Sequence, residues 1–520
     1  MKQKQLLKTN LVLALALLAQ SAYAHGSGGG ATLHYLLMAL ATLVLLVLVV
    51  RLVDGGPSKS GNGPAYTGGG KVVKLTKGFD ISLKGAAQGS ISHQPVTHFA
   101  LEPAQFIGMS PIPKLLVQEE DTVKAGDLLF FDKKRPEIKY AAPVSGQVIE
   151  VRRGAKRAID AVVILADKEM VYRSLDVVDP EKASREELVA FLLESGVWPM
   201  IRQRPYNVVA NPEVTPRDIY ISTFDTAPLA PDLNVVLDGK EAAFQKGLDV
   251  LAKLTSGKVH LGLDANGKKA PAAVYTEAKG VEKVWFSGPH PAGNVGVQIH
   301  NTQPVANGGV VWTLGVQDVA TLGALFTEGR FNASRVVAVA GPEIEKPCYV
   351  QTYIGANIGD LVKGNLDEDD ARLISGDVLS GTKVSPKSFL GFYDDQVTAV
   401  EEGDDFDLFG WLVPEKSRPT VSRTYLSYFT PKRKFKIDTN TRGERRAFVV
   451  TGQYEDVLPM NIYPQHAIKA VINGDYENME GLGLKEMVEE DIALCEFACT
   501  SKQPLQQLLR EGLDLMQSEE

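Results

Sequence analysis

A stretch of short apolar runs between positions 114 and 163 constrains the fold more than any other feature of the chain. It has two halves of similar pattern. In the first, an acidic turn and Gly126 precede Leu128–Phe131; in the second, Ala141–Gly146 precedes Val148–Val151. Short alternating strands separated by Gly, Pro and Asp predict a small all-β sandwich.

The same residues resemble the barrel-sandwich hybrid of biotinyl and lipoyl carriers, which present a modifiable lysine at a hairpin tip. Counted along that template, the tip falls at Arg135–Glu137, with Lys133 and Lys134 beside it. Pro136 stiffens this tip, and no Met-Lys-Met or Asp-Lys-Ala sequence surrounds the lysines. We therefore expect the scaffold without a swinging carrier arm.

Length and charge limit the classes of protein. A chain of 520 residues is too long for one core and predicts about three domains besides any membrane anchor. The net charge of −8 gives no sign of the strongly basic composition that is typical of nucleic-acid-binding proteins. The three cysteines, Cys348, Cys495 and Cys499, are too few and odd in number for a disulfide framework, which favours a reducing compartment.

The N-terminal region predicts membrane attachment. Residues 1–24 have the pattern of a signal peptide or a first membrane segment. Residues 31–53 include an uncharged apolar run long enough to span a bilayer, and residues 54–70 form a Gly-rich linker. Whether or not the first segment is cleaved, the number of membrane crossings and the flanking lysines predict that the body lies in the cytoplasm. It would then have a single-pass anchor in the bacterial inner membrane. The alternative is a secreted body whose apolar segment is a buried helix.

The remaining chain predicts an α+β multidomain protein. We expect a barrel-sandwich hybrid domain at 71–167 and a Rossmann-like α/β domain at 168–334, since helices and strands alternate from Ser184 onward. In that domain the pattern predicts helices from Ser184 and at 241–254, and strands at 219–222, 259–262 and 282–286. A β-grasp domain of the SLBB-like type is expected at 335–445, and a helical C-terminal domain at 446–520.

Several short sequence segments, taken in their order along the chain, indicate a more specific family resemblance. They lie at 131–139, 153–157, 194–199, 224–230, 288–293, 374–381 and 493–499. In this order they resemble the A subunit of the bacterial sodium-translocating NADH:quinone reductase, from about Lys71 to the C-terminus. The extension before Lys71 is a departure, because most family members begin near the equivalent of Lys77 and Gly78.

The resemblance implies one subunit of NADH:ubiquinone reductase (Na+-transporting), a translocase, and a chain that is not catalytic alone. It implies a cytoplasm-facing body that contributes to the quinone end and docks on the membrane-embedded, flavin-bearing B subunit. The alternative is a membrane-tethered binding or adaptor module whose carrier-like domain lacks its modified lysine. A periplasmic efflux adaptor is excluded because the two halves of the sandwich leave no room for a coiled-coil hairpin.

The family is also similar to flavin-binding and cluster-binding redox subunits, but this chain departs from them. Their Gly-rich flavin loop corresponds here to Ser195–Pro199, in which Trp198 and Pro199 replace glycine. An iron–sulfur cluster needs four thiolates, whereas only Cys495 and Cys499 are close in sequence, on one face of a predicted helix. We predict that these two and Cys348 are structural, with no metal and no tightly bound cofactor, and that flavins and NADH are held by partner subunits.

Candidate quinone-proximal residues cluster near the expected hairpin tip. A quinone pocket needs aromatic walls and a few polar groups, and the tip supplies Phe130, Phe131, Lys133, Lys134, Arg135 and Tyr140. Strand alternation predicts that Phe130 or Phe131 instead fills the sandwich core. His290 is a possible polar site, although the pattern favours a structural role for it in its Pro-flanked turn.

Overall fold

The computed structural model describes residues 42, 70–267, 270–367, 371–404, 418–422, 427, 430 and 433–519. The chain divides into two compact units, one of Met1–Gly61 with Ser422–Pro431 and one of Asn62–Val421 with Lys432–Glu520. Every element named below belongs to the second unit. The predicted signal segment and membrane span lie outside the described residues, apart from Thr42. Among the described residues, no helix combines the length and apolar character that a bilayer crossing needs.

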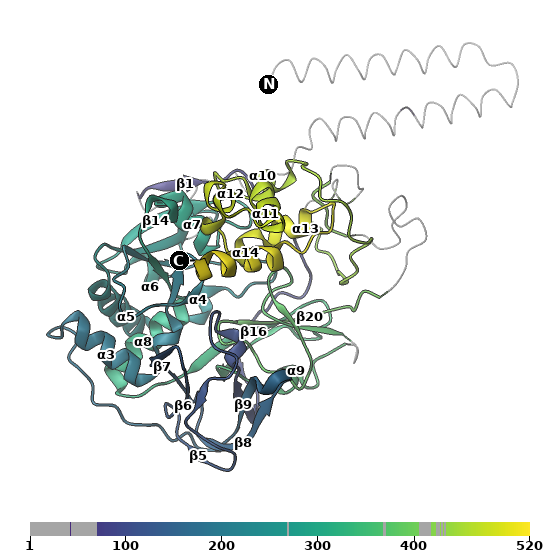
Figure 1. The fold of residues 1–520 in the computed structure, drawn as a ribbon. Coiled ribbons are helices and arrows are strands. Elements are labelled where there is room, and N and C mark those ends of the chain that lie inside the picture. Colours follow the sequence, from purple (N-terminus) through teal and green to yellow (C-terminus); the bar gives the residue numbers. More distant parts are fainter. Residues whose placement is uncertain are drawn as a thin grey trace, which may run out of the picture. The chain divides into compact units, whose positions relative to one another are not determined.

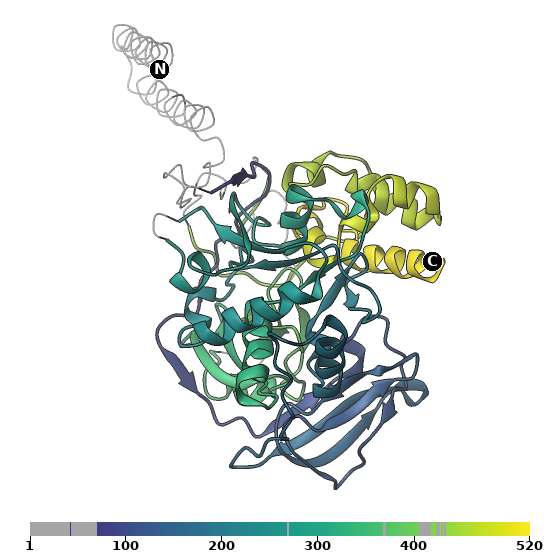
Figure 2. The ribbon, with the colours of Figure 1, turned by 90° about the vertical axis from the view of Figure 1, so that its left-hand side faces the viewer.

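The predicted barrel-sandwich module is present and is built from two small sheets (Figure 2). The four-stranded sheet has the order β3 (His98–Leu101), β9 (Ile159–Ala166), β8 (Gly146–Arg153), β5 (Thr122–Val123), and the three-stranded sheet has the order β4 (Lys114–Leu115), β6 (Leu128–Asp132), β7 (Arg135–Ala141). Phe130 is completely buried while Phe131 is half-buried, so the expectation that one of them fills the core is confirmed.

The hairpin tip differs from its predicted position. The turn consists of Lys133 and Lys134, because Asp132 pairs with Arg135 across β6 and β7. The Lys134 amide donates to the Asp132 carboxylate at 3.1 Å, an Asx-type contact that favours a tight turn at this point. Pro136 therefore lies inside β7, which it tolerates because β7 is an edge strand.

The predicted α/β domain contains a seven-stranded sheet with five neighbouring parallel strands (Figure 1). Its order is β1 (Val72–Lys74), β14 (Glu282–Ser287), β13 (Val259–Asp264), β12 (Asp218–Ser222), β15 (Val311–Thr313), β10 (Arg202–Arg204), β11 (Val208–Val209), and only the last two run antiparallel to their neighbours. β1 joins this sheet through β14, although its sequence was grouped with the barrel-sandwich module.

The helices of this domain include the two that the sequence predicts, from Ser184 and at 241–254. The helices are α3 (Arg185–Ser195), α4 (Leu233–Val236), α5 (Glu241–Leu254), α6 (Ala273–Thr276), α7 (Val295–Thr302) and α8 (Val316–Glu328). Ser184 caps α3, the helix predicted to begin there, in a complete capping box with Glu187. α5 and α8 approach closely at Gly323, where a Cβ would lie 1.8 Å from the Ala243 carbonyl oxygen.

The third domain has a six-stranded mixed sheet that includes a strand from the start of the body. Its order is β19 (Thr382–Val384), β18 (Arg372–Ser375), β20 (Gln396–Val400), β16 (Ser334–Ala340), β17 (Cys348–Tyr353), β2 (Ile91–His93), with α9 (Ile358–Val362) beside it. The parallel pairing of β2 with β17 fastens the N-terminal part of the body to this domain.

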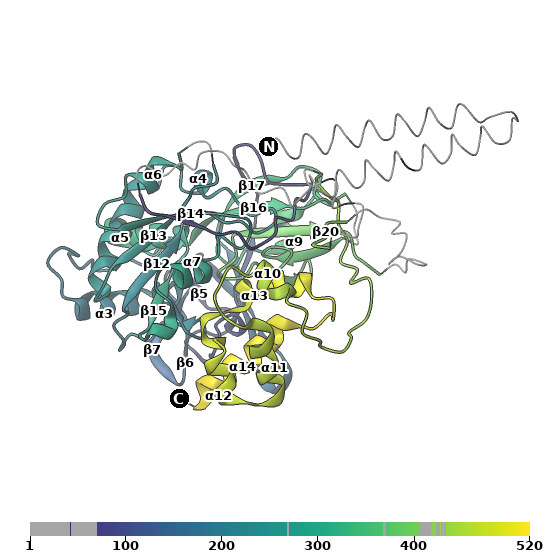
Figure 3. The ribbon, with the colours of Figure 1, turned by 90° about the horizontal axis from the view of Figure 1, so that it is seen from above.

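The C-terminal region is helical, as predicted. It consists of α10 (Gln453–Val457), α11 (Pro464–Asn473), α12 (Tyr476–Gly481), α13 (Glu489–Ala498) and α14 (Leu505–Glu519). These helices share one apolar core with Phe286 of β14 and Val297 of α7, and Figure 3 shows them beside α7. The helical region is thus packed against the end of the α/β sheet at which strands β12 and β14 finish.

Candidate functional site

Two loops at the carboxyl edge of the parallel sheet form the centre of a polar cluster. One follows β12 and carries Asp225 and Thr226; the other follows β14 and carries His290. Thr226 Oγ1 lies 3.1 Å from His290 Nδ1 and accepts a hydrogen bond from the Gly293 amide at 2.9 Å. The carboxyl edge is where open α/β sheets bind ligands, so this cluster is the first place to look for a site.

Two further domains close the cluster. Asp377 comes from the loop after β18, and Glu490 comes from the first turn of α13. Together these groups surround a small cavity of about 50 Å³, lined by Asp225, Ala227, His290, Asn294, Asp377, Leu379, Ser380, Glu490 and Ala493. We call this group of residues, with Arg204 and Asp491 behind it, the acidic junction.

His290 is the most constrained member of the acidic junction. Its side chain is 3% exposed, and its Nε2 atom has no hydrogen-bond partner among the described residues. Nδ1 is occupied by Thr226, so Nε2 is the nitrogen left for the cavity. Burial lowers the pKa of His290 to about 4, which keeps the imidazole neutral near pH 7.

Arg204 supplies the positive charge behind the cavity. It donates to Glu490 at 2.7 Å and to Asp491 at 3.4 Å, and it is almost fully buried. Burial opposes ionisation of both acids, but contact with Arg204 leaves the pKa of Glu490 lowered, whereas that of Asp491 is raised to about 7. One cation therefore serves two carboxylates, and Asp491 is the one that takes up a proton most readily.

The chemistry open to the acidic junction is limited by its size. A cavity of about 50 Å³ has room for water but not for a flavin or a quinone ring, which need sites of about 300 Å³ or more. Among the residues that the structure describes, no group of three or more His, Cys, Asp or Glu side chains is placed to hold a metal ion. The cluster can bind water and exchange protons through the fully buried Asp491.

The predicted quinone-proximal residues separate into buried and accessible groups. Phe130 and Tyr140 stack at 5.0 Å in the core, and Phe106 joins Tyr140 to Phe392 and Tyr393 of the third domain. We call these five residues the aromatic junction. Lys133 and Lys134 are exposed in the turn, and Phe131 and Arg135 are half-buried. Their contact with quinone stays a prediction.

Arg135 fastens the hairpin to the α/β domain. Its Nη1 atom donates to the Val209 carbonyl of β11 at 3.0 Å. Lys139, on the same strand, forms an ion pair with Glu194 of α3 at 2.8 Å. These contacts hold the hairpin in place and fit the expectation that it is not a swinging arm.

The region that corresponds to a Gly-rich flavin loop is filled with side chains. Ser195 and Trp198 are completely buried, and Pro199 and Met200 are also buried. The Trp198 indole donates to the Ala210 carbonyl at 2.8 Å and packs edge-on against Trp312 at 5.4 Å.

The three cysteines are free thiols. Cys495 and Cys499 are buried at the end of α13, where the Tyr454 hydroxyl lies 2.8 Å from Cys499 Sγ. Burial raises the pKa of Cys495 far above its usual range, which makes the thiolate inaccessible at neutral pH. Cys348 is half-buried on β17. These positions fit a structural role, which remains a prediction.

Sequence reasoning missed most of the acidic junction. It named His290 but not Asp225, Asp377, Glu490 or Arg204 as its neighbours. Arg204 and Glu490 lie 286 positions apart, so no local spacing could have paired them. The available sequence signal was the run of three acids, Glu489–Asp491, at the start of α13, and acids are also ordinary in the first turn of a helix.

Three family models match consecutive parts of the chain. They are described as the NqrA N-terminal barrel-sandwich hybrid domain (residues 73–167), the NqrA second alpha/beta domain (183–331) and the NQRA C-terminal domain (336–385).

The chain is also similar to curated proteins along their whole length. The A subunit of the Na(+)-translocating NADH-quinone reductase of Serratia proteamaculans is 39% identical over 456 residues, which is 86% of this chain and 100% of the relative. The proteins of the same name from Alcanivorax borkumensis and Saccharophagus degradans are 38% and 39% identical, over the same shares. Among solved structures, an air-oxidized NAD+-reducing [NiFe]-hydrogenase is 12% identical with a TM-score of 0.34, over 64% of this chain and 60% of that one.

Proposed function

Because the chain belongs to the family of the NqrA proteins, each one subunit of the Na(+)-translocating NADH-quinone reductase, an oxidoreductase complex, we propose that it is the cytoplasm-facing NqrA component of such a complex. In this role it contributes to the quinone end of electron transfer and docks on the membrane-embedded, flavin-bearing B subunit. The observation that carries the proposal is the match to relatives over their whole length, through all the domains of the body.

The proposal assigns no tightly bound cofactor to this chain. Flavins and NADH belong to partner subunits, and quinone is a substrate of the whole complex. Two features support this division: the buried Trp198 in the loop that flavin-binding relatives keep open, and the small volume of the acidic junction. The chain then contributes binding surface and positioning rather than redox chemistry.

The quinone-side role falls on the accessible part of the hairpin. Lys133, Lys134 and the half-buried Phe131 are the predicted residues that a quinone or a neighbouring subunit could reach. Phe130, Tyr140 and Arg135 support them from the core and from the contact with Val209. His290 belongs to the acidic junction and is a separate polar group.

Residues before the family match are proposed to anchor the body. The relatives align with 86% of this chain, and the predicted span at 31–53 falls in the remainder. A single-pass anchor in the bacterial inner membrane would hold the body near the B subunit, which raises its local concentration there. Deleting residues 1–53 should reduce retention of the protein in washed membranes, and unchanged retention would argue against an anchor.

The direct test is affinity purification of the tagged full-length protein from detergent-solubilised membranes. The eluate is assayed for sodium-stimulated NADH:quinone reduction, and its subunits are identified by mass spectrometry. We expect activity together with flavin-bearing partners. A lone, colourless and inactive protein would instead favour the alternative, a membrane-tethered binding module.

A charge-reversal pair examines the hairpin role within the same assay. Lys133→Glu with Lys134→Glu should raise the KM for quinone or release the B subunit, because both side chains are exposed in the turn. Lys182→Glu, at a side chain 87% exposed in another region, is the matched control and should leave activity unchanged. Equal activity of both variants would contradict a role of the hairpin turn at the quinone end of the complex.

A further inference from the structure

A basic cleft lies away from the acidic junction, where two distant segments run side by side. Leu83 and Phe435 form an isolated parallel bridge. The Lys84 amide donates to the Phe435 carbonyl at 2.9 Å, and the Phe435 amide donates to the Ser82 carbonyl at 2.9 Å. Extended segments alternate their side chains, so Leu83 and Phe435 point inward, at 4% and 6% exposed. The adjacent Lys84 and Lys434 point outward, and both are exposed.

The turn between β16 and β17 completes the cleft. The cavity has a volume of about 340 Å³ and is lined by Lys84, Gly85, Ala86, Gln88, Gly341, Pro342, Ile344, Glu345, Pro347 and Lys434. Gly85 has a positive φ of 88° and approaches the turn so closely that a Cβ would lie 2.0 Å from the Gly341 carbonyl oxygen. The cavity falls at the lower end of the size range of small-ligand pockets, about 300–1,000 Å³.

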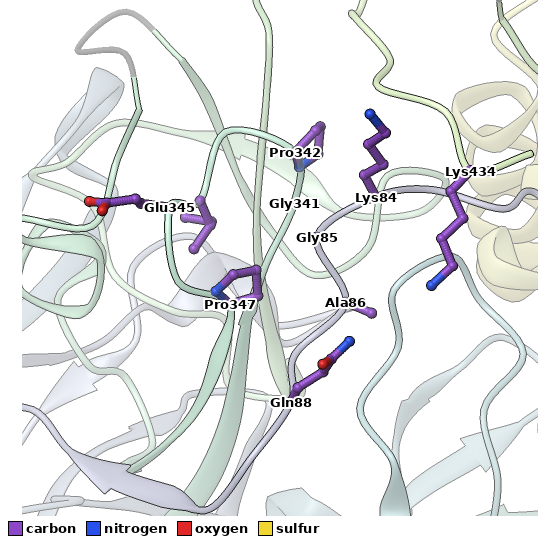
Figure 4. Close-up of a pocket in the computed structure, with 10 residues that line it drawn as sticks. Lys84, Gly85, Ala86, Gln88, Gly341, Pro342, Glu345, Pro347 and Lys434 are labelled. Carbon is purple, nitrogen blue, oxygen red and sulfur yellow. The ribbon is translucent and has the colours of Figure 1, made fainter.

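The charge of the cleft is not balanced from within. Among the described residues, neither Lys84 nor Lys434 has a carboxylate within ion-pair distance, whereas the neighbouring Lys436 lies 2.8 Å from buried Glu343. In Figure 4 the ends of Lys434 and Gln88 extend toward the same open space, whereas the Lys84 side chain extends the opposite way and the Glu345 carboxylate points away from both lysines. The Lys434 ammonium and the Gln88 amide are donors that suit phosphate oxygens, and Lys84 adds a second positive charge to the lining of the cleft.

The surroundings favour a lipid source for that phosphate. Residues 433–446 contain six basic and two acidic residues in a chain of net charge −8. The same stretch continues into Val449 and Val450, which are 53% and 52% exposed. Basic residues followed along the chain by exposed aliphatic side chains are typical of segments that lie on anionic membranes, and a site for free phosphate does not need such a segment.

The chain also reaches this cleft soon after its predicted membrane attachment. The linker predicted at 54–70 has 17 residues, which for a Gly-rich chain gives a mean end-to-end distance of about 20–25 Å. Lys84 follows 14 residues after the end of that linker. We propose that the cleft between Lys84 and Lys434 binds the phosphate-bearing headgroup of an anionic phospholipid. This inference rests on the proposed function, because it assumes that the protein works at a membrane surface.

The test compares lysine reactivity in two bilayers. The full-length protein is placed in nanodiscs of phosphatidylcholine alone or of phosphatidylcholine with phosphatidylglycerol, and acetylation of each lysine by a neutral reagent is followed by mass spectrometry. We expect Lys84 and Lys434 to react several-fold more slowly in the anionic discs. Lys156, exposed at another hairpin turn, is the control and should react equally in both. Equal rates at Lys84 and Lys434 in the two discs would overturn the proposal.

Two further arms identify the source of the phosphate and the contribution of each lysine. Inorganic phosphate added to phosphatidylcholine discs should not protect the lysines; protection equal to that in anionic discs would reassign the cleft to free phosphate and overturn the lipid proposal. Lys434→Gln should reduce the lipid-dependent protection of Lys84 about five-fold, the contribution of one basic residue near an anionic surface. Thermal melting of the variant confirms its fold.

Failure of the proposed function would be recognised separately. Sodium-stimulated NADH:quinone reduction by the purified complex reports on that function, whereas the lysine rates report on the cleft alone. Protection of the lysines without reductase activity would support the headgroup site and contradict the proposed function. Reductase activity without protection would support the proposed function and contradict the headgroup site.

Discussion

The aromatic junction and the acidic junction each join three domains, but they do so in opposite ways. At the aromatic junction, Phe106 contacts Tyr140 at 4.4 Å and Phe392 at 5.0 Å, and the Tyr393 hydroxyl donates to the Pro199 carbonyl at 2.7 Å. At the acidic junction, His290 Nε2 and Asp491 Oδ1 are buried without partners among the described residues.

The difference indicates what each junction is for. Apolar rings gain stability from every contact they make, and the aromatic junction needs no further partner. A buried polar atom without a partner lowers stability by about 1–3 kcal/mol, so the acidic junction lowers stability where the domains meet. Such costs persist at sites that need water or proton exchange. We therefore expect the two junctions to respond differently to substitution and to pH.

Removing a ring from the aromatic junction should give the largest effect. Phe106 is 2% exposed and contacts rings from two domains, so Phe106→Ala should lower the free energy of unfolding by about 3–5 kcal/mol. Urea denaturation of the full-length protein measures this change. Phe497→Ala, at a ring 38% exposed, is the control and should stay within about 0.5 kcal/mol. A loss below about 1 kcal/mol for Phe106→Ala would mean that the rings do not hold the domains together.

Neutralising Asp491 should change the pH dependence of stability. Its pKa rises from about 4 in the unfolded chain to about 7 in the folded chain, because burial outweighs Arg204. The folded state therefore holds a proton that the unfolded state has lost, and stability falls as pH rises from about 4 to about 7, then levels off. Asp491→Asn removes that fall. The difference in the free energy of unfolding, variant minus wild type, should therefore be larger at pH 8 than at pH 4, by at most about 4 kcal/mol.

Denaturation at several pH values tests this expectation. Asp514→Asn, at a carboxylate 57% exposed, provides the comparison and should follow the wild-type curve. If Asp491→Asn also follows the wild-type curve, Asp491 is ionised in both states and the acidic junction carries no buried proton.

A methyl group at Gly296 should disturb the acidic junction without changing any charge. A Cβ there would lie 2.2 Å from Asp491 Oδ2, because the first turn of α7 rests on that carboxylate. Gly296→Ala should therefore lower the free energy of unfolding by about 1–3 kcal/mol. Gly481→Ala, at the end of α12 with no atom within 4 Å of the new Cβ, should instead raise it by up to about 1 kcal/mol. An unchanged or raised free energy of unfolding for Gly296→Ala would contradict the close contact with Asp491.

The local parts of this structure could be predicted, and the reason is visible in particular residues. Ser184 and Glu187 lie within one turn of each other and form a capping box at the start of α3, where the sequence predicts a helix. α5 has the predicted bounds because its apolar positions repeat within one helix. The hairpin turn was placed two residues too late, since counting along a template ignored the Asx contact between Asp132 and Lys134.

The parts that depend on distant segments could not be predicted. Val72 pairs with Trp285 of β14, and nothing in a short run of valine and lysine names that partner. Arg204 meets Glu490 and Asp491 only because the helical region folds back onto the α/β sheet. The sequence therefore predicted His290 as a polar group and missed the carboxylates that make its surroundings unusual.

The smallest effect should come from the hydrogen bond at the edge of the aromatic junction. Tyr393→Phe keeps the ring beside Phe106 and Phe392 but removes the hydroxyl that donates to the Pro199 carbonyl. The expected loss in the free energy of unfolding is about 0.5–1.5 kcal/mol, the contribution of a single neutral hydrogen bond. Urea denaturation at pH 5 and pH 8 should give the same loss, because none of the five rings of this junction ionises between those values. A loss as large as that of Phe106→Ala would show that the aromatic junction depends on its polar contact as much as on its rings, and the contrast between the two junctions would disappear.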